Sequence, residues 1–122
     1  MTDFAILYVE DNDHLREAIG MLMEGEGREV VPCGSGEEAL ALAGERRFDV
    51  VVTDVSLPGI SGAELAKRLL KSDPDRWVVL CSGYDFANSV DQLGKNVRAL
   101  RKPFEIDELD ALIAEIHAAR KA

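Results

Sequence analysis

The sequence predicts an α/β fold, a doubly wound five-stranded parallel sheet with five helices. Two observations predict it: short apolar runs alternate with stretches of helical periodicity, and each apolar run stops at polar or turn-forming residues. A strand that is covered by helices on both faces reads as a continuous apolar run. The 122 residues have the length of one domain, and we expect 1–122 to be a single domain.

Five runs are expected to be strands. Residues 4–9, 49–53 and 77–81 are apolar almost throughout, as strands buried on both faces of a parallel sheet are, and residues 29–33 read as a further strand. Residues 97–101 are more polar, so we expect this fifth strand at an edge of the sheet. Crossovers between parallel strands are right-handed, which places helices on both faces.

Helical patterns follow each strand. Apolar residues recur at helical spacing over 15–23, and Ser35 and Ser61 each precede a glutamate by three residues, which is the spacing of a capping box. A weaker pattern over 86–93 predicts a short helix. Residues 106–116 give the clearest amphipathic helix of the chain.

Composition excludes several classes of function. The formal net charge of −9 and the lack of a basic stripe argue against direct binding to nucleic acid. No apolar run approaches the roughly 20 residues that span a bilayer. The first residues, Met1-Thr2-Asp3, lack the basic region of a signal peptide. We therefore expect a cytoplasmic protein with no membrane partner.

The cysteines and histidines show no metal-binding pattern. Cys33 and Cys81 lie far apart in apolar segments without a CxxC or Cys/His spacing, so buried free thiols are expected. His14 and His117 have no partner at ligand spacing and are expected at solvated helix positions.

Polar residues stand where the apolar runs stop: Glu10 and Asp11 after the first, Asp54 after the third, Ser82 after the fourth and Lys102 after the fifth. Ligands of open α/β sheets bind beyond the carboxyl ends of the strands, so these side chains should converge. Clustered carboxylates repel one another, which raises at least one pKa or requires a hard divalent cation such as Mg²⁺. Taken singly, Asp11 and Asp54 could be ordinary strand-end or N-cap residues. The ordered set favours a site.

This set resembles the receiver domain of bacterial response regulators over essentially the whole chain. The resemblance rests on five motifs: Glu10-Asp11, Asp54 after 50–53, Leu57-Pro58-Gly59 with Ser61-Gly62, Ser82-Gly83, and Lys102-Pro103-Phe104. It implies the flavodoxin-like strand order 2-1-3-4-5.

The resemblance also implies roles for individual residues. Asp54 would be the phosphoacceptor, and Asp11 and Asp54 would coordinate Mg²⁺. Glu10 would reach the ion directly or through water, and the backbone carbonyl of Ser56 would complete the protein ligands.

Around the phosphoryl group, the resemblance implies that the Ser82 side chain donates a hydrogen bond and that Lys102 pairs with the group. The backbone amides near Ser82 and Gly83 would stabilise its charge, and Gly83 would leave room for it. The Lys102–Pro103 peptide bond would be cis.

The implied activity is phosphorelay signalling. A histidine kinase or a histidine phosphotransfer protein would donate the phosphoryl group, and hydrolysis by water would remove it again. Such a domain catalyses only its own phosphorylation and dephosphorylation, so it is not an enzyme with an independent substrate. The downstream protein target is unknown, and both a stand-alone receiver and the receiver of a hybrid histidine kinase fit the pattern.

Two positions bear on signalling. The family usually carries an aromatic residue three positions before the conserved lysine, where this chain has Ala99. The usual aromatic switch is therefore in doubt. Tyr84, two positions after Ser82, is a candidate modulator of the lifetime of the acyl phosphate, with an ordinary exposed loop position as the alternative.

Three other functions compete. A haloacid-dehalogenase-type phosphatase also uses an Asp nucleophile and Mg²⁺, but it needs an acid two residues later, where this chain has Ser56. A phosphorylation-independent interaction module would usually have lost acids of the set, which is intact here. A flavodoxin-like flavin binder would need a Ser/Thr/Gly-rich phosphate loop after the first strand.

Overall fold

Five strands and four helices make up the part of the chain that the computed structural model describes, residues 4–25, 27–83 and 93–121. They are β1 (Phe4–Val9), α1 (Asp13–Met23), β2 (Arg28–Cys33), α2 (Gly36–Glu45), β3 (Val50–Asp54), α3 (Gly62–Ser72), β4 (Trp77–Ser82), β5 (Val97–Arg101) and α4 (Ile106–Lys121). The helix expected over 86–93 lies largely outside the described residues.

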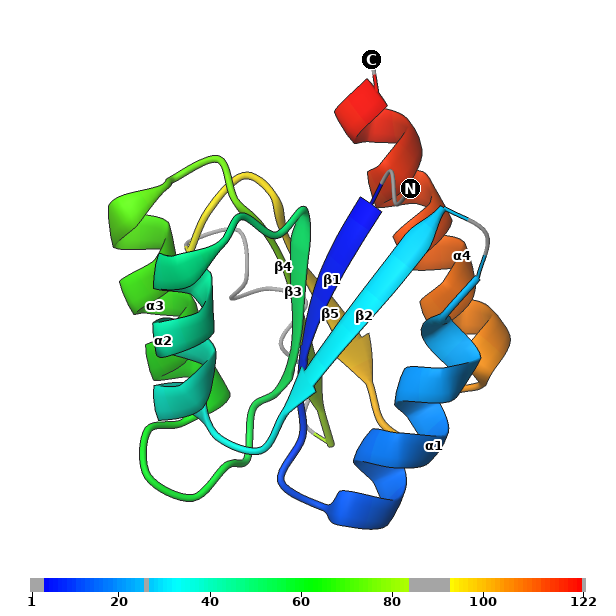
Figure 1. Cartoon of the computed structure of the whole chain (residues 1–122), viewed down its shortest axis with the longest axis horizontal. Helices are drawn as coiled ribbons and strands as arrows, with labels where there is room; N and C mark the ends of the chain where they lie inside the picture. Colours follow the sequence, from blue (N-terminus) through cyan, green and yellow to red (C-terminus); the bar gives the residue numbers. More distant parts are fainter. Residues whose placement is uncertain (1–3, 26, 84–92, 122) are drawn as a thin grey trace.

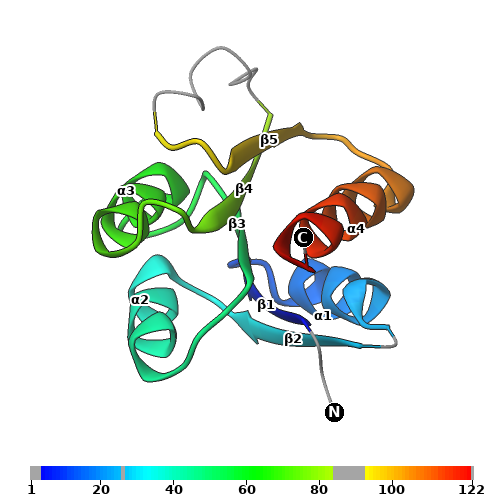
Figure 2. The same cartoon turned by 90° about the horizontal axis from the view of Figure 1, so that it is seen from above.

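The strands form one parallel sheet in the order β2-β1-β3-β4-β5. The predicted sheet and its order are confirmed, and β5 lies at an edge as its polarity suggested. Helices α1 and α4 cover one face of the sheet and α2 and α3 cover the other, so the sheet is doubly wound (Figures 1 and 2). The carboxyl ends of all five strands therefore point to one edge of the sheet.

Side chains alternate along β1 between two hydrophobic cores. Phe4, Ile6 and Tyr8 face α1 and α4, where they pack against residues of α4 such as Ile113. Ala5, Leu7 and Val9 face α2 and α3. Every residue of β1 is buried, which is why the strand reads as a continuous apolar run.

Side-chain caps fix the starts of the helices. Ser35 Oγ accepts a hydrogen bond from the Glu38 amide and Ser61 Oγ accepts one from the Glu64 amide, both at 3.1 Å, so the two predicted helix starts are confirmed. Asn12 caps α1 in the same way. Helix α4 extends beyond the apolar pattern that predicted it, because residues 118–120 at its end are exposed and continue no apolar period.

The thiols match the prediction, but one histidine does not. Cys33 and Cys81 are free and buried. His14 is exposed as expected. His117 is not a solvated position, because its ring stacks on Phe4 with the ring centroids 4.5 Å apart. The apolar face of α4 passes over β1 and brings the two rings together. Within the described residues, no helix combines the length and the apolar character that crossing a membrane requires.

Candidate functional site

Three carboxylates meet where β1 and β3 end. Glu10 and Asp11 directly follow β1, and Asp54 is the last residue of β3, the strand paired with β1. Carboxylate oxygens of the three residues lie within 4.8 Å of one another. The side chains of Glu10 and Asp54 are only 5% and 12% exposed, whereas Asp11 faces solvent. The predicted convergence of these acids at one edge of the sheet is therefore present.

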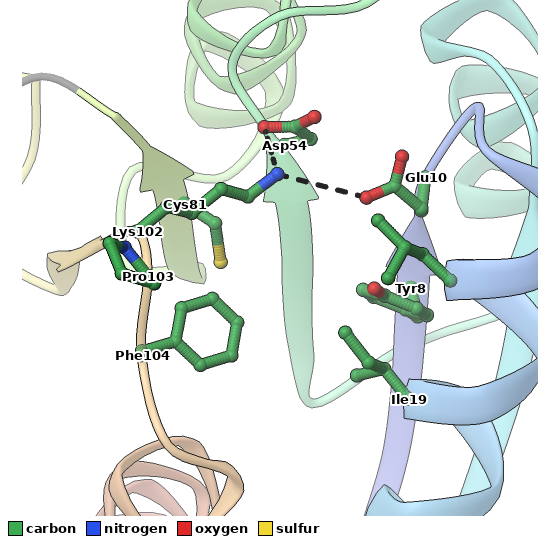
Figure 3. A pocket seen from close by; sticks show the side chains of 9 residues that line it. Tyr8, Glu10, Ile19, Asp54, Cys81, Lys102, Pro103 and Phe104 are labelled. Atoms are coloured by element: carbon green, nitrogen blue, oxygen red, sulfur yellow. Dashed lines mark ion pairs between the residues drawn. The ribbon is translucent and has the colours of Figure 1, made fainter.

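Lys102 brings a positive charge into this cluster. Its Nζ lies 3.1 Å from Asp54 Oδ1 and 3.8 Å from Glu10 Oε1, so the ammonium stands between the two buried carboxylates (Figure 3). The Lys102 amide donates a 2.7 Å hydrogen bond to the Ser82 carbonyl, which ties the segment after β5 to the end of β4. The carboxylates therefore come from the ends of the inner strands β1 and β3, and the ammonium comes from the segment after the edge strand β5.

The crowding of acids shows in Glu10. Burial raises the pKa of the Glu10 carboxyl, and its hydrogen bond with Asp11 and the charge of Asp54 raise it further, against the opposing effects of the Asn12 amide and Lys102. The expectation that at least one carboxyl in the cluster has a raised pKa is therefore confirmed. Burial is the largest cause of this raised pKa, and the neighbouring acids Asp11 and Asp54 add to it.

Unlike Glu10, Lys102 is shifted towards its charged form. Burial disfavours its charged form, but the hydrogen bond to Asp54 and the charges of Asp54 and Glu10 outweigh burial and raise the pKa of the Lys102 ammonium. The lysine is therefore a permanent cation at neutral pH. One cation does not balance three carboxylates.

The donor set suits a hard divalent cation. All three side chains offer carboxylate oxygens, the ligands that Mg²⁺ prefers, and no nitrogen or sulfur donor joins the group. In the described part of the chain, no other cluster of His, Cys, Asp and Glu side chains meets the same spacing. The residues present therefore fit magnesium.

A polar hollow of about 440 Å³ opens on one side of Asp54 and Lys102. Ser82, Gly83 and Lys102, which the resemblance assigned to the phosphoryl group, all line it, and so does Ser56, whose carbonyl the resemblance assigned to the metal. A Cβ atom added at Gly83 would meet no heavy atom within 4 Å, so the space beside this glycine is open. A tetrahedral anion next to Asp54 could contact the ends of both β3 and β4.

A second hollow, also of about 440 Å³, lies between α1 and the segment after β5. Its lining is mostly apolar, with Glu10, Asp54 and Lys102 at one end and Tyr8 beside them, and the ring of Phe104 and the sulfur of Cys81 face into it (Figure 3). Asp54 and Lys102 line both hollows, so the ion pair stands between them.

At the end of the loop from β3 to α3, Gly62 packs closely against the backbone of Asp54 and Val55. A Cβ atom at this position would lie 2.2 Å from the Asp54 carbonyl oxygen, and the Gly62 amide donates a 2.8 Å hydrogen bond to the Val55 carbonyl. Only glycine allows the start of α3 to approach the Asp54 backbone so closely. From the other side, Glu37 of α2 accepts a hydrogen bond from the Ile60 amide at 3.2 Å.

The remaining expected residues are placed as follows. The Lys102–Pro103 bond is cis. Ala99 packs against the core that α3 shares with β4 and β5, and its side chain carries no aromatic ring that could turn. Tyr84 lies outside the described residues.

Sequence reasoning missed Arg16 and Glu37. Arg16 donates a 2.9 Å hydrogen bond to the Glu10 carbonyl, directly behind the acidic cluster. Its spacing from Asp13, three residues on one helix, was a usable signal because such pairs contact each other. Glu37 carried no signal, because its partner Ile60 lies 23 residues further along the chain.

Comparison with known proteins decides the family. Residues 6–114 match the response regulator receiver domain. The chain belongs to the response regulator receiver family. It is a receiver domain of two-component signalling, a class of protein that is phosphorylated on an aspartate.

Related receivers occur in longer proteins. This receiver is 37% identical over 118 residues to the uncharacterized transcriptional regulatory protein YkoG of Bacillus subtilis, with 93% of this chain and 50% of YkoG covered. It is 36% identical over 121 residues to the response regulator GacA of Pseudomonas aeruginosa, with 95% of this chain and 56% of GacA covered. The chain spans about half the length of these relatives.

Solved receiver structures superpose over almost the whole chain. A receiver domain protein from Clostridium thermocellum has a TM-score of 0.85 at 27% identity, with 97% of each chain covered. The response regulator TrrA of Thermotoga maritima, solved in complex with Mg(2+)-BeF, has a TM-score of 0.82 at 29% identity, with 93% of this receiver and 98% of TrrA covered.

Proposed function

We propose that Asp54 accepts a phosphoryl group from a phosphohistidine of a histidine kinase or a histidine phosphotransfer protein, in a Mg²⁺-dependent reaction. One observation carries the proposal: the Asp54 carboxylate lies both in the three-carboxylate cluster and 3.1 Å from the Lys102 ammonium, at the edge of the polar hollow. A metal ion, the Lys102 ammonium and an incoming phosphoryl group could therefore all contact the Asp54 carboxylate.

The residues would act as follows. A carboxylate oxygen of Asp54 attacks phosphorus in line, an O–P bond forms, and the N–P bond to the donor histidine breaks. Negative charge spreads over the equatorial oxygens, where the Lys102 ammonium, the Ser82 hydroxyl and the Gly83 amide stabilise it. Gly83 leaves the required space open.

Glu10, Asp11, Asp54 and the Ser56 carbonyl would hold the magnesium ion, Glu10 directly or through water. When bound, the ion neutralises charge on the phosphoryl oxygens. Water attack on the acyl phosphate then restores the free Asp54 carboxylate. In this proposal residues 1–122 are one receiver domain that catalyses only its own phosphorylation and dephosphorylation and turns over no independent substrate.

The proposed partners are proteins. Acidic character, with a net charge of −9, disfavours direct contact of these residues with nucleic acid, and a cytoplasmic location without a membrane partner completes the proposal. TrrA, a structural relative, is solved in complex with Mg(2+)-BeF, which supports magnesium as the metal of this site. Both a stand-alone receiver and the receiver of a longer protein, such as a hybrid kinase, fit the same site. The downstream target is unknown.

Incubation with acetyl phosphate and Mg²⁺, followed by intact mass measurement, tests the assignment. We expect one added phosphoryl group in the wild-type receiver and none in Asp54→Asn or when the metal is removed with EDTA. Asp107→Asn, an exposed acid in the first turn of α4, is the matched control and should be phosphorylated like the wild type. Phosphorylation that persists in Asp54→Asn would remove the assignment.

Tyr84 remains a proposed modulator of the signal. If its ring shields the acyl phosphate, Tyr84→Ala should shorten the phosphoryl half-life measured by the same mass assay. An unchanged half-life would reject this role and leave the phosphoacceptor assignment intact.

A further inference from the structure

Arg16 makes several contacts with the loop 10–13, which carries Glu10 and Asp11. Its Nη1 donates a 2.9 Å hydrogen bond to the Glu10 carbonyl, and its Nη2 pairs with Asp13 Oδ1 at 2.6 Å. Its backbone amide donates to the Asn12 carbonyl at 2.9 Å. One residue of α1 therefore holds three of the four positions from 10 to 13.

The other bonds of the loop complete a closed turn. The Glu10 amide donates to the Cys33 carbonyl at 3.1 Å, and Glu10 Oε2 accepts from the Asn12 amide at 3.0 Å. These hydrogen bonds hold Glu10 and Asn12, the two chain neighbours of Asp11, so the backbone of Asp11 is fixed between them. Without Arg16, the Glu10 carbonyl and the Asp13 carboxylate would lose the contacts that hold them to each other.

The guanidinium is confined as well as bonded. A Cβ atom added at Gly34, in the turn between β2 and α2, would lie 3.2 Å from Arg16 Nη1, so glycine at this position makes room for the arginine. The Arg16 side chain is 25% exposed, and Arg16 lines neither hollow beside Asp54. It therefore supports the loop from behind without entering the site.

We propose that Arg16 is a positioning residue for the metal site: its two-armed guanidinium fixes the loop 10–13 so that the carboxylates of Glu10 and Asp11 are held ready to bind Mg²⁺ with Asp54. The inference rests on the proposed magnesium site and deepens it. Groups that orient metal ligands from outside the ligand set typically change metal affinity by 10–100-fold.

Charge and geometry make opposite predictions for this residue. A nearby positive charge opposes a cation, so if Arg16 acted through charge alone, its removal would strengthen Mg²⁺ binding. If it acts by holding the loop, its removal weakens binding. Lysine keeps the charge but lacks the two-armed donor geometry of a guanidinium, so Arg16→Lys separates the two effects.

The experiment is a Mg²⁺ titration of the full chain, followed by amide chemical shifts and run beside a thermal melt. We expect the Mg²⁺ dissociation constant to rise about tenfold or more in both Arg16→Met and Arg16→Lys. Arg46→Met is the matched control, because Arg46 also makes two hydrogen bonds to an acid, Glu29, but lies away from the loop. Its dissociation constant should equal that of the wild type.

Each other result overturns the inference. Tighter binding in Arg16→Met with no change in Arg16→Lys would show that charge alone acts. Lower melting temperatures with unchanged dissociation constants would show a purely structural role. If Arg16→Met does not fold, Arg16→Lys decides alone, and wild-type affinity in that variant rejects the positioning role. Wild-type protein that binds no Mg²⁺ would instead refute the proposed function itself.

Discussion

Replacing Gly62 by alanine should damage the phosphorylation site from outside it. The added Cβ would lie 2.2 Å from the Asp54 carbonyl oxygen and 2.8 Å from Val55 Cα. Ordinary contacts of this kind begin at 3.4 Å, so the backbone of Asp54 or the start of α3 has to move by about 1 Å. Both neighbours are backbone atoms, which cannot turn aside as a flexible side chain could.

The cost follows from that displacement. Overpacking of this kind costs about 1–3 kcal/mol, and we expect the upper half of the range because the 2.8 Å hydrogen bond from the Gly62 amide to the Val55 carbonyl is disturbed too. For a domain of this size the melting temperature should fall by about 10 °C. A 1 Å misplacement of Asp54 should also slow phosphorylation by acetyl phosphate about 100-fold.

Gly44→Ala is the matched control. It makes the same chemical change in α2 at an exposed position, where the new Cβ meets no heavy atom within 4 Å. Alanine is the better helix former, so stability should rise by about 0.5–1 kcal/mol with no change in the phosphorylation rate. A Gly62→Ala variant with wild-type melting temperature and rate would refute the close-approach argument.

Further variants test the cation, the core and the thiols. Lys102→Met removes the cation beside Asp54 and should lower the rate of phosphorylation by acetyl phosphate about 100-fold, measured by intact mass. Ile113→Ala, at a fully buried position, should cost about 2–5 kcal/mol in urea unfolding, whereas Leu22→Ala, 58% exposed, should stay within about 0.5 kcal/mol. Burial raises the pKa of Cys33 to about 11 and that of Cys81 to about 12, so a thiol reagent at pH 8 should label the folded chain far more slowly than the unfolded one. Because folding favours both neutral thiols, their contribution to stability is complete below pH 9 and falls as the pH rises towards those values.

Much of the fold could be predicted because the signals are local. A strand buried on both faces must be apolar along its length, as β1 is, and a serine three residues before a glutamate caps a helix wherever the helix lies. The edge position of β5 followed from its polarity. The end of α4 was not predicted, because residues 118–120 are exposed and leave no periodic apolar pattern.

The functional site also has parts that local sequence signals predict and parts that they do not. Polar residues at strand ends are visible in the amino-acid sequence, and parallel strands end at one edge of their sheet, so the meeting of Asp54 and Lys102 could be predicted. The loop contacts of Gly62 and Glu37 could not, because Gly62 matters through a contact with backbone and Glu37 through an amide 23 residues away. His117 was misjudged for a related reason: its neighbour, Phe4, lies at the other end of the chain.

Because of the strand order, the sheet holds Glu10 and Asp54 more firmly than it holds their partner Lys102. Glu10 and Asp54 extend from β1 and β3, each of which has a hydrogen-bonded neighbour on both sides, whereas Lys102 follows β5, which has only β4 beside it. When the charge on Asp54 changes, the lysine is the member of the pair that can shift at least cost. We therefore expect structural change to spread from Lys102 into β5 and α4, while the acids keep their places.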